Sequence, residues 1–339
     1  MRLLRFAKDL LVGNALPTND AYYYGRLSTM GKSVYNAMVL GIRSFSNEIA
    51  LPYAPQDLVS AVFDSVLRDN PLIFYTTSYS VTSNVQKRLC RLHPNYMYPQ
   101  NTATQYIDRI VQYLRNFDAV QEKPDIDKEL YVHDFCLNHF KYDYSFGENA
   151  FSILGPVLKG SAVCEGIAKF VKLALDYLGV RCIVVHGNAN DPIHGADSKH
   201  AWNIAKISGQ TFHLDVTFNL TQKTVQNRYD YFNLCDDEIK KDHSFASGYP
   251  KCVTPDRDYY SLYGLAANSP SELGVIIGNN LRQGKMTTIA KLKNVTDDTA
   301  IFNKVISVAE RQFSSMFNQS IMIEVRYNPK QMVFEIEYK

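Results

Sequence analysis

Apolar residues recur at helical spacing in the N-terminal part of the chain. Three segments show this pattern: 27–44, 55–69 and about 102–118. Between the second and third, the run from Ile73 to Val81 is rich in β-branched and aromatic residues, which predicts a strand. Residues 1–120 are therefore expected to form a mixed, mainly helical N-terminal region.

A polar linker with a proline at 121–125 predicts a domain boundary. A helix is predicted over 126–141, and a second helix opens at Cys164 or Glu165. That second helix is expected to end before Gly179, because glycine readily adopts the left-handed conformation that follows many helices.

The strand signals come after this helix. Residues 181–186 predict a short buried strand, and 187–199 are rich in Gly, Asn and Asp and predict a loop. Two further strands are predicted over 200–207 and 210–218, joined by the Ser-Gly dipeptide at 208–209.

The tail resembles a small α+β module. Helices are predicted over 272–283 and 299–317, and alternating runs at 321–327 and 331–338 predict a hairpin around the Asn-Pro pair at 328–329. The whole chain is thus expected to be α+β, in three parts: an N-terminal region at 1–120, a core at 121–265 and a C-terminal module at 266–339.

Composition narrows the class of protein. The 339 residues are 46% hydrophobic, which is enough for a substantial core, and 36 basic against 34 acidic residues give a net charge of +2. This balance does not favour nucleic-acid binding. The N-terminal segment is interrupted by charges and lacks a secretory signal, and no run could span a membrane. A cytoplasmic location is expected, or a secreted or cell-wall location if a signal peptide had been removed.

The six cysteines form no Cys-x-x-Cys pair, so neither a disulfide framework nor a zinc ribbon is expected, and no cofactor is indicated. Histidines and aspartates lie together in one stretch of the chain, which raises the alternative of a metal site. These residues are His186, Asp191, His194, Asp197 and His213. Their spacing matches no ligand pattern, and a solvated loop at the rim of a site is the preferred interpretation.

One cysteine stands at a position suited to chemistry. Cys164 follows a small-residue turn and begins an apolar-periodic run, and N–H groups at a helix start favour a thiolate. Ser161 and Gly166 are small, so a substrate carbonyl could approach closely, with the Cys164 N–H as one oxyanion donor. Judged alone, such a cysteine is more often an inert buried residue.

His200 and Asp215 complete the order that thiol acyl chemistry requires. A two-residue turn at 208–209 would place Trp202 opposite Asp215, and His200 would share that face as a diagonal neighbour. His200 is therefore the expected base and Asp215 the residue that orients it. Trp202 could shield the imidazole, although plain core packing explains it equally well.

These residues resemble the transglutaminase-like superfamily, of a bacterial type. The matching pieces are Gly160 to Gly166, His200 to Asn203, Asp215 to Asn219, Tyr231 to Leu234 and Lys241 to His243. The resemblance implies a papain-like core, in which a helix bearing the cysteine packs on an antiparallel sheet that carries the histidine and the aspartate. It assigns the nucleophile to Cys164, the base to His200 and the third member to Asp215.

The sequence departs from this family in details. Phe218 stands where many relatives have tryptophan, the zinc cysteines of the deglycosylating members are missing, and so is the lead-in of the arylamine acetyltransferases. We expect acyl-enzyme chemistry on a peptide or glutamine amide, with hydrolysis preferred. A crosslinking transglutaminase and a non-catalytic scaffold are the alternatives. The expected partner is a peptide or protein substrate, and the sequence does not indicate an oligomeric state.

Overall fold

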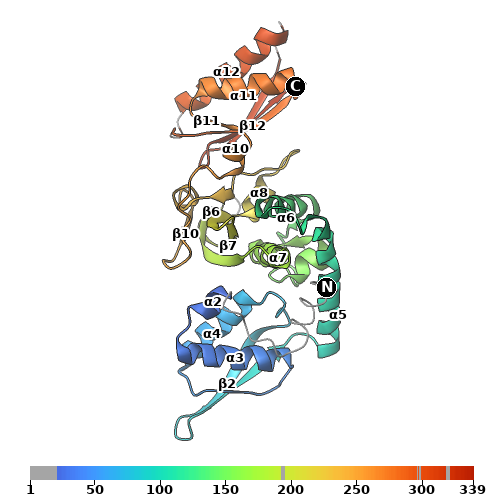
Figure 1. The fold of residues 1–339 in the computed structure, drawn as a ribbon, viewed down its shortest axis with the longest axis vertical. Coiled ribbons are helices and arrows are strands. Elements are labelled where there is room, and N and C mark those ends of the chain that lie inside the picture. The colour runs from blue at the N-terminus through green and yellow to red at the C-terminus, as the bar shows by residue number, and fades with distance from the viewer. Residues whose placement is uncertain (1–20, 192–194, 296, 298, 318–320) are drawn as a thin grey trace. The chain divides into compact units, whose positions relative to one another are not determined.

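The computed structural model describes residues 21–191, 195–295, 297, 299–317 and 321–339. The chain divides into two compact units (Figure 1). One contains Met1–His186 and His200–Gly209, and the other contains Gly187–Lys199 and Gln210–Lys339. The division into three parts at 120 and 265 stays a prediction.

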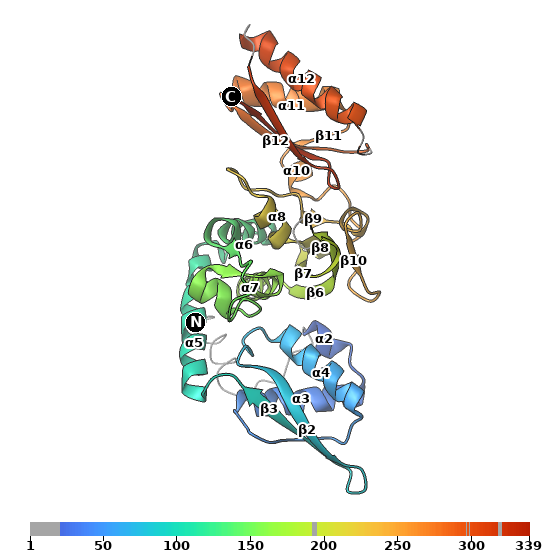
Figure 2. The same cartoon turned by 180° about the vertical axis from the view of Figure 1, so that it is seen from behind.

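The N-terminal part of the first unit joins three helices to a small antiparallel sheet in the order β1-β3-β2 (Figure 2). Its elements are α2 (Tyr22–Gly25), α3 (Thr29–Arg43), β1 (Ile49–Leu51), α4 (Gln56–Asp69), β2 (Thr76–Asn84) and β3 (Leu89–Tyr96). The predicted helices are confirmed because α3 and α4 each bury one apolar stripe. The predicted strand begins only at Thr76, since Ile73 belongs to a turn after Pro71.

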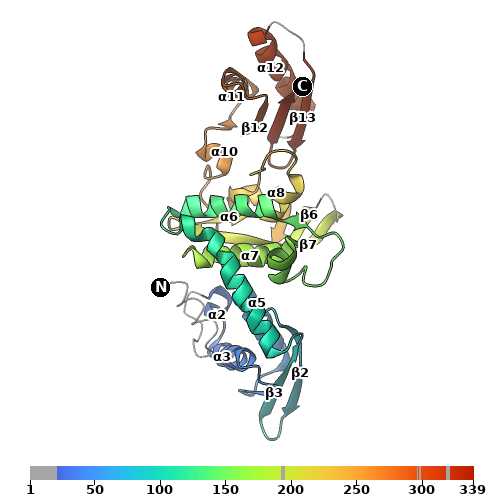
Figure 3. The ribbon, with the colours of Figure 1, turned by 90° about the vertical axis from the view of Figure 1, so that its right-hand side faces the viewer.

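A helical layer follows in the same unit. It contains α5 (Gln100–Tyr113), the 3₁₀ helix η1 (Leu114–Val120), α6 (Asp125–His139) and α7 (Cys164–Tyr177). Helices α6 and α7 lie side by side (Figure 3), with the ring centroids of Phe140 and Phe170 4.8 Å apart. The predicted stop is also confirmed, because Gly179 has a φ of 80° directly after α7. The short elements β4 (Lys141–Tyr142), η2 (Gly155–Lys159) and β5 (Ser161–Ala162) connect α6 to α7.

A five-stranded sheet has the order β10-β6-β7-β8-β9. Its strands are β6 (Cys182–Asp191), β7 (Gly195–Ile207), β8 (Gln210–Leu214), β9 (Phe232–Leu234) and β10 (His243–Phe245). The prediction of a loop over 187–199 was wrong for 187–191 and 195–199, which belong to β6 and β7, while 192–194 lie outside the described residues. Residues 187–189 pair with β10 in antiparallel register, and this partner strand lies some 55 residues further along the chain.

The predicted strand over 210–218 was also wrong in its second half. Strand β8 ends at Leu214, and helix α8 (Val216–Gln222) begins immediately after it. The cause is local, because the Asp215 side chain accepts a hydrogen bond from the Phe218 backbone N–H and caps the helix. Asp215 therefore lies at a strand-to-helix junction.

The C-terminal module is an α+β layer pair, as predicted. It contains β11 (Ala266–Ala267), α11 (Pro270–Arg282), β12 (Thr287–Leu292), α12 (Thr299–Phe317), β13 (Ile323–Asn328) and β14 (Val333–Tyr338). The sheet order is β11-β12-β14-β13, and α11 and α12 pack on it through a shared apolar core (Figures 1 and 2). The predicted hairpin is confirmed, with Asn328 opposite Val333. Two short helices, α9 (Asp236–Ile239) and α10 (Tyr259–Leu262), precede the module.

The observed fold is α+β with antiparallel sheets, which confirms the predicted class. Across the described residues, the helices are too short or too polar to cross a bilayer.

Candidate active site

Cys164 is the first residue of α7, as the sequence predicted. Val163 before it is extended, and its N–H donates to the Ala150 carbonyl over 3.1 Å. Strand β5 pairs in parallel with β4, so the three residues before the cysteine are held on both sides. This anchoring fixes the backbone at the helix start, where the N–H groups of the first turn point outward.

Gly166 lies in the first turn of α7, and packing explains why it has no side chain. An added Cβ would lie 2.4 Å from the Ala150 carbonyl oxygen and 2.8 Å from the Ala162 Cβ. The segment 150–152 thus packs directly against Gly166. Ser161 lies in β5, two residues before the helix. Roles of Ser161 and Gly166 near an oxyanion stay predictions.

We expect Gly166→Ala to lower the free energy of unfolding by about 1–3 kcal/mol, because the segment at 150–152 must move away from the helix. Urea denaturation measures this loss. Gly25→Ala is the matched control, since a Cβ at Gly25 would meet nothing within 4 Å. Equal stabilities of the two variants would contradict the packing explanation.

Burial separates Cys164 from the other cysteines. All six lie in the described part of the chain, and five are buried, whereas Cys164 is half-buried. Burial raises the pKa of the Cys136 and Cys182 thiols well above the ordinary value, and it raises that of Cys252 to about 12. Buried thiols of this kind are inert, so Cys164 is the thiol best exposed for reaction.

Glu165, beside the cysteine, is neutralised by two basic groups. Its carboxylate lies 2.9 Å from the Lys169 ammonium and 2.7 Å from His186 Nε2. Burial alone would raise the pKa of Glu165, but the hydrogen bond from His186 and the Lys169 charge outweigh it and lower the pKa to about 2. The carboxylate next to Cys164 therefore adds little net negative charge to the helix start.

His200 lies on β7, and residues next to it hold this strand against α7. Ala201 packs with Ala168 and Val184 in a small core, and Cys164 packs against the same core. The Asn203 amide donates to the Ala168 carbonyl over 3.0 Å. The first unit thus fixes the strand that carries His200 against the helix that carries Cys164.

The His200 ring is buried and stacks on Trp202, with centroids 5.9 Å apart and an interplanar angle of 17°. The two side chains therefore share one face of β7, as predicted. The turn after β7 also has the predicted length, because Ser208 and Gly209 both have positive φ, which is typical of a two-residue hairpin turn. That Cys164, His200 and Asp215 meet stays a prediction.

Asp215 belongs to the second unit and is completely buried there. Its Oδ1 caps α8, and its Oδ2 lies 3.1 Å from His243 Nε2. The other ring nitrogen of His243 lies 2.6 Å from Asp242 Oδ1. Burial would lower the pKa of His243, but hydrogen bonds to Asp215 and then Asp242 raise it. The imidazole thus lies between two carboxylates, and both favour its protonated form.

Sequence reasoning did not give His243 a role. The segment Lys241 to His243 was noticed only as a resemblance, although a buried aspartate such as Asp215 requires a partner. That requirement was the available signal, and β10 supplies the partner.

A cavity of about 420 Å³ lies in the first unit, beside α7. Its wall is mainly apolar and includes Leu67, Ile73, Phe74, Met97, Phe151 and Lys169. Two further lining residues, Asn149 and Ser152, flank Ala150 and its bond to Val163, so the cavity borders the segment that anchors Cys164. Its size and lining suit an apolar side chain.

One cluster of side chains in the second unit has ligand types that can bind a metal ion. The ligand atoms of His213, Asp236 and Cys252 lie within 4.8 Å of one another. However, His213 Nε2 already bonds Asp236 over 3.0 Å, and the raised pKa of Cys252 keeps its thiol protonated. Hydrogen bonding explains this group without a metal. The sequence also raised a metal site among the histidines and aspartates around 187–199. Of these histidines, His186 is hydrogen-bonded to Glu165, and His194 lies outside the described residues.

Comparison with known proteins finds a family match in the middle of the chain. Residues 111–216 match the model of the transglutaminase-like superfamily. No curated protein matches the chain. Two solved structures show weak similarity. A TGase is 16% identical, with 45% of this chain and 47% of that chain covered and a TM-score of 0.29. The other is described as a putative cysteine protease from Cytophaga hutchinsonii and is 14% identical, with 41% and 61% covered and a TM-score of 0.24. The alignments span less than two thirds of either solved chain.

Proposed function

We propose that this protein, whose residues 111–216 match the transglutaminase-like superfamily, is a cysteine hydrolase of peptide or glutamine amide bonds. The Cys164 thiolate attacks the amide carbonyl, the C–N bond breaks, and His200 gives its proton to the leaving amine. Water then attacks the thioester while His200 takes a proton from it, the C–S bond breaks, and the acid is released with the Cys164 thiolate and the protonated His200 restored. Asp215 orients the His200 ring.

The position of Cys164 carries the proposal. The thiol is half-buried, stands at the first residue of a 14-residue helix, and lies within the matched domain. A helix start offers N–H groups and a partial positive charge to an anionic sulfur. The paired carboxylate of Glu165 does not oppose that charge strongly.

The apolar cavity beside α7 supports a peptide as the substrate. An extended peptide could place one apolar side chain in this space of about 420 Å³ while its backbone runs past the helix start. Hydrolysis is preferred over transfer to an amine, because no feature of the described residues identifies an amine site.

We expect iodoacetamide at neutral pH to label Cys164 at least about tenfold faster than any other cysteine, because the other thiols are buried. Peptide mass spectrometry over a time course measures each rate. The rate at Cys164 should fall in His200→Ala and stay unchanged in His93→Ala, a control histidine on β3. Labelling of Cys164 no faster than of Cys90 would reject the enzyme proposal in favour of a scaffold.

The choice between water and an amine as acceptor needs a separate assay. The protein is incubated with casein in the presence of a fluorescent primary amine. We expect new amino termini or released ammonia without incorporation of the amine. Incorporation that depends on Cys164 would instead assign a crosslinking transglutaminase.

A further inference from the structure

We infer that Asn328, at the end of β13 in the C-terminal hairpin, is a positioning residue for the Asp215–His243 pair. A chain of buried hydrogen bonds joins these residues, and every member lies within the second unit. The inference rests on the proposed function only where it concerns the role of Asp215 in catalysis.

The chain begins with an amide whose orientation is fixed by the hairpin turn. Asn328 Oδ1 accepts hydrogen bonds from the backbone N–H groups of Lys330 and Gln331, over 3.0 and 3.2 Å. Because the oxygen is held there, the Nδ2 group must point the other way. Asn328 is buried, so its two amide protons require acceptors within the protein.

The acceptors belong to the core. Asn328 Nδ2 lies 3.2 Å from the Tyr231 hydroxyl and 3.1 Å from Asp230 Oδ2. Burial and the charge of Asp242 raise the pKa of Tyr231 well above its ordinary value, so the hydroxyl keeps its proton. Tyr231 donates that proton to Asp242 Oδ2 over 2.6 Å. The position of the Asn328 amide thus determines where the Tyr231 hydroxyl lies, and the hydroxyl in turn holds Asp242.

Asp242 in turn holds the imidazole that bonds Asp215. The distances are 2.6 Å from Asp242 Oδ1 to His243 Nδ1 and 3.1 Å from His243 Nε2 to Asp215 Oδ2. Each carboxylate therefore uses one oxygen for His243 and the other for a second partner, Tyr231 or the Phe218 N–H. A displacement of Tyr231 would rotate Asp242 and with it the imidazole.

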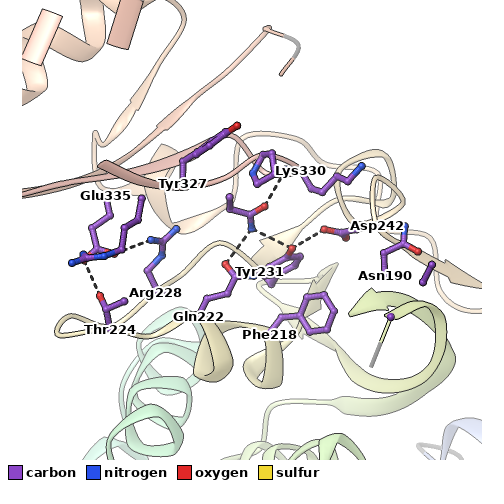
Figure 4. A pocket seen from close by; sticks show the side chains of 15 residues that line it. Asn190, Phe218, Gln222, Thr224, Arg228, Tyr231, Asp242, Tyr327, Lys330 and Glu335 are labelled. Carbon is purple, nitrogen blue, oxygen red and sulfur yellow. Dashed lines mark hydrogen bonds and ion pairs between the residues drawn. The ribbon is translucent and has the colours of Figure 1, made fainter. Parts of the chain in front are cut away.

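A cavity borders this chain of hydrogen bonds. Its volume is about 470 Å³, it is lined in part by Phe218, Tyr231, Asp242 and Asn328, and Figure 4 shows the first three at its wall. Where neighbours are missing, side chains keep their positions through hydrogen bonds, and loss of one bond is felt along a network. The cavity makes the donor from Asn328 more important than it would be in a filled core.

The hairpin itself is tied to the core by a second branch. Arg228 bonds Asp230 Oδ2 over 2.7 Å and Glu335 of β14 over 3.1 Å. The Tyr260 hydroxyl donates to Asp230 over 2.8 Å. Asp230 therefore accepts from the Asn328 Nδ2 group independently of Tyr231, and the hairpin should stay docked when only the Asn328 amide group is changed.

Two variants and one control test the inference. Asn328→Asp keeps an acceptor for the turn but replaces the amide donor that faces Tyr231, and Tyr231→Phe removes the next hydroxyl. Gln222→Ala is the control, because Gln222 accepts from the same amide over 3.3 Å and is not a member of the chain that runs through Tyr231 and Asp242 to His243. Thermal melts first establish that all three variants remain folded.

The first readout is the NMR titration of the His243 ring, which requires no activity. The ionisable groups that face this ring include Asp215, Asp242, Tyr231 and His213. Without the hydrogen bond from the Tyr231 hydroxyl, the Asp242 carboxylate stabilises the protonated form of His243 more strongly, and this raises the pKa of His243. We expect the titration midpoint to rise by about half a unit or more in both variants and to stay unchanged in the control. An unchanged midpoint in both variants would contradict the inference that Asn328 positions His243 through these hydrogen bonds.

The second readout is catalysis, measured at saturating and limiting substrate. We expect kcat to fall about tenfold in Asn328→Asp with KM unchanged, because orientation and not substrate binding is lost. A shifted His243 titration with full kcat would overturn the positioning role. If the wild-type protein has no activity, the proposed function fails, and the titration alone decides whether Asn328 holds the Asp215–His243 pair.

Discussion

Replacement of Cys164 with alanine is expected to reduce amide hydrolysis by a factor of about 10⁴ or more, because the variant has no atom that can form the thioester. The fold should survive, since the side chain is half-buried and alanine is a good helix former. The loss should therefore appear in kcat without a change in the melting temperature.

Fluorescent casein and a quenched peptide library measure this loss, because both report hydrolysis without knowledge of the natural substrate. Cys164→Ser is the second variant, which retains a weak nucleophile of similar size. Cys90→Ser on β3 is the control and should keep its activity. Hydrolysis that persists in Cys164→Ala would assign the activity to another group or to a contaminant.

The sequence was sufficient to predict the helix that carries this cysteine. Gly160, which has a φ of 62°, ends the preceding element η2, and Gly179, which has a φ of 80°, follows the end of α7. Both positions require conformations that glycine adopts without strain, so the signals are local. The hairpin turn at Ser208 and Gly209 was predictable for the same reason, since its length follows from a dipeptide.

The errors arose where a distant segment decides the local structure. Residues 187–189 form a strand because β10 pairs with them, and no pattern within those residues reveals the partner. At Asp215, two local signals competed. The apolar run predicted a strand, but the Asp215 side chain accepts a hydrogen bond from the Phe218 N–H and caps a helix, so the chain continues as α8.

The partner of Asp215 could not be predicted from the sequence, because it depends on tertiary structure. His243 is 28 residues further along, and only the return of the chain as β10 brings its ring to the carboxylate. The same applies to Asn328, which lies in the C-terminal hairpin. The residues that orient a catalytic group can thus lie far outside the motif that identifies it.

Loss of the Asp215 carboxylate is expected to lower both stability and activity. Asp215→Ala removes a helix cap, worth about 1 kcal/mol, and a hydrogen bond to a charged partner, worth about 2 kcal/mol, so unfolding should become easier by about 3 kcal/mol. Asp215→Asn keeps an oxygen for the Phe218 N–H and should lose mainly the second contribution. With His200 no longer oriented, activity should fall about 10⁴-fold in both variants.

The pH dependence of stability separates the cap from the charged pair. The folded protein raises the pKa of His243 above its unfolded value, so this contribution is complete below about pH 6.5 and is lost as the pH rises through the folded pKa. Urea denaturation measures the free energy of unfolding at about pH 6 and about pH 9. This free energy should decrease from the lower to the higher pH in the wild type, and it should decrease less in Asp215→Asn. Ser269→Ala, which removes only the cap of α11, should cost about 1 kcal/mol at both pH values. If Asp215→Asn lost stability with pH as steeply as the wild type, Asp215 would not be the carboxylate that holds the charged form of His243.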